Sequence, residues 1–154
     1  HMFDNLVHMS KKFKNMAVLT GYELKLSRQL KEGADVWLNN PRVTREASGT
    51  SGMTAAMNGA INFSTNDGWV REFKDLFEEQ NSFVLPIADH TMPTFIQDQI
   101  DLDNLYDMLE NNILPLYYNH PEQWLELIKT SMAQVAPYFD SDRMADEYYT
   151  KLYR

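Results

Sequence analysis

The sequence of 154 residues is 44% hydrophobic and 23% charged, a balance typical of one globular domain or of part of a larger one. Its net charge of −8, from 22 acidic and 14 basic residues, argues against nucleic acid as a partner, because phosphate binding draws on clustered Lys and Arg. The absence of cysteine excludes disulfides and thiolate metal sites, and no apolar run approaches the roughly 18 residues of a membrane span. We interpret His1–Met2 as a cloning remnant, find no targeting signal after it, and expect a cytoplasmic protein.

The first half of the chain alternates strand-like and helix-like segments. Short apolar runs predict strands over 16–19 and 35–38. Between them, apolar residues spaced four apart predict a helix over 22–32 that ends at Gly33.

A further helix and two further strands follow. Apolar residues recur with helical spacing from Met53 to Met57, which predicts a helix that begins near Gly52. A buried strand is predicted over 60–64, and a short edge strand over 83–85. Strands separated by short helices predict right-handed βαβ units and an α/β fold with a small parallel sheet. One exposed edge of so small a sheet is typical of part of a larger domain.

The second half of the chain is predicted to form helices separated by polar breaks. Asp101 is the expected N-cap of a helix whose buried stripe comprises Leu102, Leu105, Leu109 and Ile113. A second helix opens at Pro121 and closes at Pro137, with inward residues at Leu125, Ile128, Met132 and Val135. A third follows Asp140, with Met144, Tyr148 and Leu152 turned inward.

One segment departs from ordinary globular sequence, because small and hydroxylic residues from Glu46 to Met53 lead straight into a predicted helix. Glycine lets a ligand approach the backbone, the first N–H groups of a helix have no internal partner, and the helix dipole favours negative charge. These residue types fit an anion cradle, with Glu46 available to accept hydrogen bonds from sugar hydroxyls. They fit a helix N-cap with a plain polar loop equally well.

The order of residues in this region resembles that of a known family. The matching strings are VWLNNPR at 36–42, EASGTSGM at 46–53, NG at 58–59, DGW at 67–69 and ILPLYY at 113–118. Together they resemble the C-terminal part of the α-glucan (glycogen/maltodextrin) phosphorylases, most closely the bacterial branch. The resemblance extends from about Met16 to the end of the chain, and its most specific part is 35–69.

The resemblance implies a retaining glycosyltransferase with two Rossmann-like lobes, the GT-B arrangement, and an active-site cleft between them. We expect 1–15 to hold the cloning remnant and a leading helix, 16–90 the C-terminal part of the second lobe, and 91–154 its closing helices. The parent enzyme would transfer glucosyl units between an α-1,4-glucan and phosphate, giving glucose 1-phosphate. Its N-terminal lobe and the basic residues for inorganic phosphate would lie upstream, so the isolated chain is expected to be inactive.

The resemblance also implies roles for single residues. Glu46, with the backbone N–H groups of Ser48 and Gly49, would hold the glucosyl ring. The N–H groups of Thr50 and Ser51 would cradle the phosphate of pyridoxal phosphate, which in the family acts on the inorganic phosphate substrate. No residue of this chain is assigned as a certain catalytic group.

Thr54 departs from the family pattern. Family phosphorylases hold pyridoxal phosphate through a Schiff-base Lys directly after the Met, and this chain has Thr54 there. A hydroxyl cannot form an imine with an aldehyde, so covalent attachment at this position is excluded, whereas noncovalent binding stays open. The cofactor is therefore implied by the family and put in doubt by this residue.

The sequence gives weaker support to the remaining candidate functional residues. His8, His90 and His120 lack the close spacing of a zinc site, so no metal is expected. Asp89 beside His90 suggests a catalytic dyad, but no nucleophile motif accompanies it. Trp69 follows the strand over 60–64 and is a substrate-side candidate, because parallel sheets bind ligands at that edge.

Two other functions stay open. A nucleotide-sugar-dependent GT-B transferase would use the same cradle for a diphosphate, but such enzymes place a second acid where this chain has Met53. A noncatalytic glucan-binding module would keep Glu46 and the fold without cofactor chemistry.

Overall fold

The computed structural model describes residues 2–74, 77 and 80–153, which fall into two units, His1–Leu30 and Lys31–Arg154. The first unit contains the predicted leading helix, α1 (Met2–Lys12), and most of α2 (Leu24–Gly33), which ends at the predicted glycine. The strand predicted over 16–19 is absent, because these residues lie in irregular backbone. A strand needs a partner for its N–H and C=O groups, and the described part of this unit holds no other extended segment.

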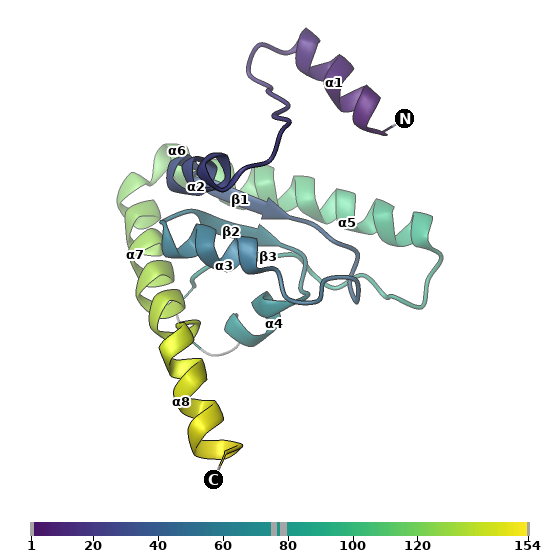
Figure 1. Cartoon of the computed structure of the whole chain (residues 1–154). Coiled ribbons are helices and arrows are strands. Elements are labelled where there is room, and N and C mark those ends of the chain that lie inside the picture. Colours follow the sequence, from purple (N-terminus) through teal and green to yellow (C-terminus); the bar gives the residue numbers. More distant parts are fainter. Residues whose placement is uncertain (1, 75–76, 78–79, 154) are drawn as a thin grey trace. The chain divides into compact units, whose positions relative to one another are not determined.

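A three-stranded parallel sheet organises the second unit (Figure 1). The strands are β1 (Val36–Asn39), β2 (Ile61–Ser64) and β3 (Phe83–Val84), in the order β1-β2-β3. The register pairs Val36 with Ile61 and Phe63 with Phe83. The small parallel sheet and its three strands are therefore confirmed, and their carboxyl ends lie at one edge.

The central strand β2 separates two packed layers. Ile61 and Phe63 belong to a buried cluster with Phe83, Leu85, Ile113, Trp124 and Leu127. Asn62, from an alternate position along the strand, donates its Nδ2 to the carbonyl oxygen of Gly52 at 3.0 Å. This bond ties β2 to α3 (Thr50–Met57), the helix predicted to begin near Gly52. A second cluster unites Ala56 of α3 with Val135 and with residues of α4 (Trp69–Phe73), a short helix that the sequence did not predict.

The helix predicted to start at Asp101 begins earlier. It is α5 (Thr94–Met108), which follows Pro93 and places Asp101 in its middle, so the N-cap assignment is wrong. No glycine or proline interrupts residues 94–108, and nothing stops the helix from extending back to Thr94. Most of the predicted stripe packs against the core, but Leu102 remains 45% exposed.

A π-helical turn, η1 (Leu109–Ile113), joins α5 to α6 (Leu114–Asn119). Pro115 explains it, because proline has no N–H to donate to the carbonyl four residues earlier and its ring crowds that carbonyl. Widening the preceding turn relieves the crowding and leaves Ile113 2% exposed in the core.

The long helix α7 (Pro121–Tyr138) opens at Pro121 as predicted but continues past Pro137. Its buried residues are Trp124, Leu127, Ser131 and Val135, so the predicted inward positions Leu125 and Met132 are wrong. Trp124 decides the rotation of the helix, because its ring packs against Phe83 at 6.4 Å and Tyr117 at 5.1 Å between ring centroids.

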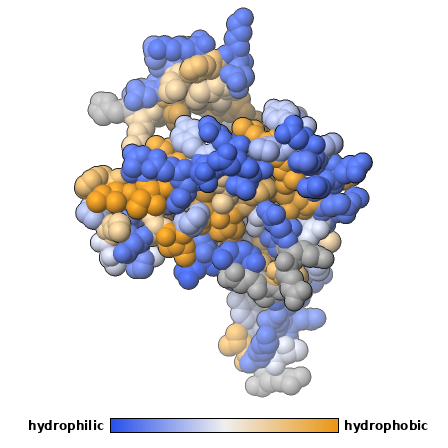
Figure 2. All heavy atoms as spheres, turned by 180° about the vertical axis from the view of Figure 1, so that it is seen from behind, coloured by the Kyte–Doolittle hydropathy of each residue, from blue (hydrophilic) through white to orange (hydrophobic). Residues whose placement is uncertain are grey.

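The last helix, α8 (Ser141–Lys151), has its predicted N-cap, since Asp140 accepts a hydrogen bond from the backbone N–H of Asp142 at 2.7 Å. Met144, Tyr148 and Leu152 were expected to point inward, but they are 51%, 46% and 66% exposed. Figure 1 shows the reason, because α8 extends beyond α7 and away from the sheet. Figure 2 shows apolar side chains interspersed with hydrophilic ones on the rear face. None of the described helices is long and apolar enough to cross a bilayer.

Candidate functional site

The loops that leave β1 and β2 meet at the carboxyl edge of the sheet. The loop after β1 carries Glu46, and Asn39 at the end of that strand points its Nδ2 toward Oε2 of Glu46 at 3.5 Å. The loop after β2 carries Asp67. This edge is where parallel sheets place ligand-binding loops, and the predicted segment over 46–53 lies there.

Asp67 holds two consecutive backbone N–H groups of the loop after β1. Its Oδ2 accepts hydrogen bonds from the N–H groups of Arg45 at 3.0 Å and Glu46 at 2.9 Å. Its Oδ1 accepts the N–H of Gly68 at 3.0 Å, and the residue is only 6% exposed. Three N–H groups occupy most of the acceptor sites of this buried carboxylate, so Asp67 organises the loop rather than binding a ligand.

The next two residues extend this support. The N–H of Trp69 donates to the carbonyl oxygen of Ser48 at 2.8 Å. A Cβ at Gly68 would lie 2.7 Å both from Cγ of Glu46 and from that same carbonyl oxygen. Gly68 also has φ 60, so only glycine allows the two loops to pack this closely. The sequence identified Asp67-Gly68-Trp69 as a turn but not as the support of the Glu46 loop. An Asp three residues after the end of a buried parallel strand, followed by Gly, is the signal that points to it.

Trp69 itself lies inside the molecule, so the prediction of a substrate contact there is wrong. It is 2% exposed, and its ring stacks against Phe73 at 5.1 Å between centroids. A Cβ at Gly49 would come within 3.0 Å of Cδ1 of Trp69. The indole therefore packs against the buried side of the loop that carries Glu46, while the other side of that loop faces solvent.

Gly49 ends the loop and starts the helix. It has φ 86 in the left-handed region and supplies no side-chain cap to α3. The first N–H groups of α3 therefore remain available to an external acceptor, and Thr50 and Ser51 are exposed beside them. The position of a Gly49 Cβ lies 3.6 Å from Cγ of Glu46, which puts the carboxylate stem next to this helix end. The structure thus brings together Glu46, Ser48, Gly49, Thr50 and Ser51 as an open loop and helix N-terminus.

Thr54 lies one turn further along α3. Its hydroxyl donates within the helix, with the carbonyl oxygens of Thr50 and Ser51 both at 3.1 Å. It is exposed, and its own carbonyl accepts Nδ2 of Asn58 at 2.7 Å. Side chains on a helix point toward its N-terminus, so position 54 faces the same end as the open N–H groups. A hydroxyl here supplies no amine, so the residues present do not fit a covalently held aldehyde cofactor.

The other candidates are separate from this site. Asp89 accepts both the N–H of Thr91, at 2.9 Å, and its hydroxyl, at 2.7 Å. These bonds lower the pKa of Asp89, and they define a local turn instead of a dyad with His90. Among the described residues, no three His, Asp or Glu side chains cluster as metal ligands.

Comparison with known proteins shows which family this chain resembles. A family model described as carbohydrate phosphorylase matches residues 3–113. A maltodextrin phosphorylase of Thermococcus litoralis is 41% identical over 144 residues, which cover 92% of this chain and 17% of that protein. An uncharacterized protein of Methanocaldococcus jannaschii is 39% identical over 152 residues, covering 99% of this chain and 28% of that protein. A glycogen phosphorylase of Mycobacterium tuberculosis is 34% identical over 143 residues, covering 90% and 16%. The chain thus spans less than a third of the length of each of these relatives.

Proposed function

This chain belongs to the carbohydrate phosphorylase family, and we propose that it forms the glucosyl- and phosphate-binding part of a retaining α-glucan phosphorylase of GT-B architecture. The observation that carries the proposal is the three-way hydrogen bonding of Asp67, which holds Glu46 beside the open N-terminus of α3. A carboxylate and a set of free N–H groups side by side suit a ligand that is sugar at one end and phosphate at the other.

Glu46 would bind the sugar end of this ligand. An ionised carboxylate accepts two or more hydrogen bonds, and sugar hydroxyls are donors of matching geometry. The N–H groups of Ser48 and Gly49 would add donors for the oxygens of the same ring. Because Asp67 fixes the backbone N–H of Glu46 at 2.9 Å, little conformational freedom would be lost when the ring binds.

The first turn of α3 would bind the phosphate end of the ligand. The N–H groups of Thr50 and Ser51 and the positive end of the helix dipole favour an anion there. This arrangement suits the phosphate of a sugar phosphate or a noncovalently bound pyridoxal phosphate. Thr54 does not fit covalent attachment of that cofactor, so no reaction step is assigned to it.

The reaction would be transfer of a glucosyl unit between an α-1,4-glucan and phosphate, giving glucose 1-phosphate. It would need an N-terminal lobe and basic residues for inorganic phosphate outside the matched region, because the chain corresponds to 17% of the Thermococcus relative. The protein's partners would then be an α-glucan, phosphate or glucose 1-phosphate, and that lobe.

Thr54 favours one second candidate, a noncatalytic glucan-binding module of the same fold. Its hydroxyl donates within its own helix and supplies no amine for an imine with a cofactor, while Glu46 remains in place. A nucleotide-sugar-dependent transferase stays a prediction from the sequence, with Met53 against it.

The proposal is tested by titrating the 154-residue chain with glucose 1-phosphate while following its backbone amide resonances. We expect shifts at residues 46–51, and Glu46→Gln should weaken binding about tenfold, since a charge-assisted hydrogen bond exceeds a neutral one by roughly 1.4 kcal/mol. Glu122→Gln, at an exposed position on α7, is the matched control and should bind as the original chain does.

Three outcomes separate the hypotheses. Competition by inorganic phosphate at Thr50 and Ser51 supports the phosphate end. Binding of maltotetraose at 46–49 without any effect of phosphate favours the noncatalytic module. Resonances at 46–51 that respond to neither ligand overturn the proposal.

A further inference from the structure

One buried amide joins the central strand of the sheet to the helix N-terminus at the candidate site. Asn62 lies in β2, a strand that is buried along its whole length, and is itself 1% exposed. Its Nδ2 donates to the carbonyl oxygen of Gly52, in the first turn of α3, at 3.0 Å. The bond fixes where this turn lies against β2, and with it the open N–H groups of Thr50 and Ser51.

Gly52 lets the helix approach the strand this closely. A Cβ at Gly52 would lie 2.8 Å from Oδ1 of Asn62 and 2.9 Å from Nε1 of Trp69, closer than a Cβ atom packs. Any larger residue at this position would push the first turn of α3 away from the strand and from the indole. The contact between α3 and β2 therefore depends on a glycine in the helix and an amide in the strand.

This contact is unfavourable for stability taken alone. Asparagine is depleted in strands, and glycine is a poor helix former. Oδ1 of Asn62 and Nε1 of Trp69 are both buried, and neither has a hydrogen-bond partner among the described residues. A buried polar atom without a partner is unfavourable for folding. Departures from local rules of this kind are expected at functional sites, so they point to a role for Asn62 in positioning α3.

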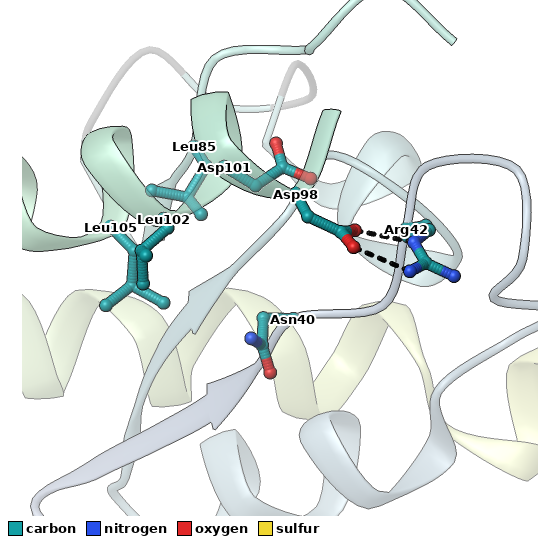
Figure 3. A pocket seen from close by; sticks show the side chains of 7 residues that line it. All are labelled: Asn40, Arg42, Leu85, Asp98, Asp101, Leu102 and Leu105. Atoms are coloured by element: carbon teal, nitrogen blue, oxygen red, sulfur yellow. Dashed lines mark hydrogen bonds and ion pairs between the residues drawn. The ribbon is translucent and has the colours of Figure 1, made fainter. Parts of the chain in front are cut away.

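The loop that carries Glu46 has anchors of its own. Asp67 accepts the N–H of Glu46 at 2.9 Å. Earlier in the same loop, Nε and Nη2 of Arg42 donate to the two carboxylate oxygens of Asp98 in α5, each at 2.6 Å, beside a cavity of about 180 Å³ (Figure 3). These contacts hold the loop to its neighbours, whereas the bond from Asn62 holds the N-terminus of α3.

We propose that Asn62, acting through Gly52, is a positioning residue that sets the distance between the Glu46 carboxylate and the open N–H groups of α3. The proposal rests on the proposed function, because it takes the sugar end and the phosphate end of one ligand to lie at these two places. A ligand that carries both ends gains affinity over either end alone only where the spacing matches. Glucose 1-phosphate has its phosphate bonded directly to the ring and therefore requires a short, fixed spacing. A small displacement of α3 would weaken this ligand and spare ligands that have a single end.

Three ligands test this role on the 154-residue chain: glucose 1-phosphate, inorganic phosphate and glucose, each followed at the amide resonances of 46–51. Asn62→Leu keeps the branched shape of the side chain, but a methyl group cannot approach a carbonyl oxygen as closely as an N–H donor does. We expect glucose 1-phosphate to bind about tenfold more weakly, with the affinities for phosphate and glucose unchanged within about twofold. Gly52→Ala should give the same pattern from the helix side, since alanine favours the helix but its Cβ displaces it. Gly33→Ala, at the end of α2, is the matched control, because a Cβ there meets nothing within 4 Å.

Thermal unfolding separates positioning from a purely structural role. Asn62→Leu removes a buried oxygen that has no donor, so its melting temperature should be no lower than that of the original chain although its affinity for glucose 1-phosphate falls. Equal weakening of all three ligands would show that the fold is merely loosened. Unchanged affinity for glucose 1-phosphate in both variants would show that the spacing does not depend on this contact. Either result overturns the role of Asn62 and leaves the proposed function standing, whereas an original chain that binds none of the three ligands at 46–51 overturns both.

Discussion

Thr54 determines which chemistry the N-terminus of α3 can support. The hydroxyl donates to the carbonyl oxygens of Thr50 and Ser51, so it can neither donate to a ligand nor give up its proton as a nucleophile without losing those contacts. A lysine at the same position would extend toward the helix N-terminus, because helical side chains point that way. The adjacent N–H groups would bind the phosphate of an aldehyde cofactor while the amine reacts with the aldehyde.

Thr54→Lys therefore tests whether the cradle still matches pyridoxal phosphate. We expect borohydride reduction with this cofactor to give an adduct that mass spectrometry maps to residue 54, and inorganic phosphate should suppress it. Thr150→Lys is the matched control, since Thr150 is also exposed and donates to carbonyl oxygens three and four residues earlier, those of Glu147 and Asp146. Equal labelling of the two engineered lysines would mean that the cradle has no affinity for the cofactor phosphate.

Among the structural elements, the turn between β2 and α4 controls the loop that carries Glu46. Asp67→Asn keeps the shape of the side chain but presents at most one acceptor oxygen to three N–H donors. We expect the free energy of unfolding to fall by about 2–3 kcal/mol, because buried donors lose a charged acceptor. The amides of Arg45 and Glu46 should exchange with solvent faster. Asp89→Asn, at an exposed turn, should change stability by less than about 1 kcal/mol.

A normal exchange rate at Arg45 in Asp67→Asn would contradict this role. Glucose 1-phosphate binding gives a second readout, since a loosened loop should bind more weakly even where the fold is retained.

The elements that could be predicted from the sequence are those that depend on residues close together in the chain. Apolar runs predicted the strands at Val36–Asn39 and Ile61–Ser64, and local hydrogen bonding predicted the cap at Asp140. The rotation of α7 and the exposed stripe of α8 could not be predicted in this way. An amphipathic pattern shows that one face is apolar, but contacts distant in the sequence, such as Trp124 with Phe83, select which residues are covered.

In the candidate site, too, the local features could be predicted from the sequence and the long-range contacts could not. Small residues before a helix predicted a helix that begins near Gly52, close to the observed first residue Thr50, because a helix start is a local property. The support by Asp67 joins residues more than twenty positions apart, and it became visible only when parallel pairing brought β1 and β2 together. The cavity lined by Arg42 of the loop after β1 and by Asp98 of α5 is likewise assembled from distant segments, so no single stretch of sequence signals it.

At the scale of the whole molecule, the chain presents the proposed binding edge of the sheet and only part of what phosphorolysis would require. It spans 17% of the maltodextrin phosphorylase of Thermococcus litoralis, and its described residues place Glu46 and the α3 N-terminus on an open surface. Orienting two reactants contributes roughly 7–11 kcal/mol to rate acceleration, and an open surface cannot supply it. We therefore expect the purified 154-residue chain to form no glucose 1-phosphate from maltotetraose and phosphate, although we expect it to bind the product. The assay is a coupled measurement of glucose 1-phosphate, with the Thermococcus enzyme as the positive control. Turnover that persists in the original chain but disappears in Glu46→Gln would show that these residues catalyse without a second lobe, and would contradict the two-lobed proposal.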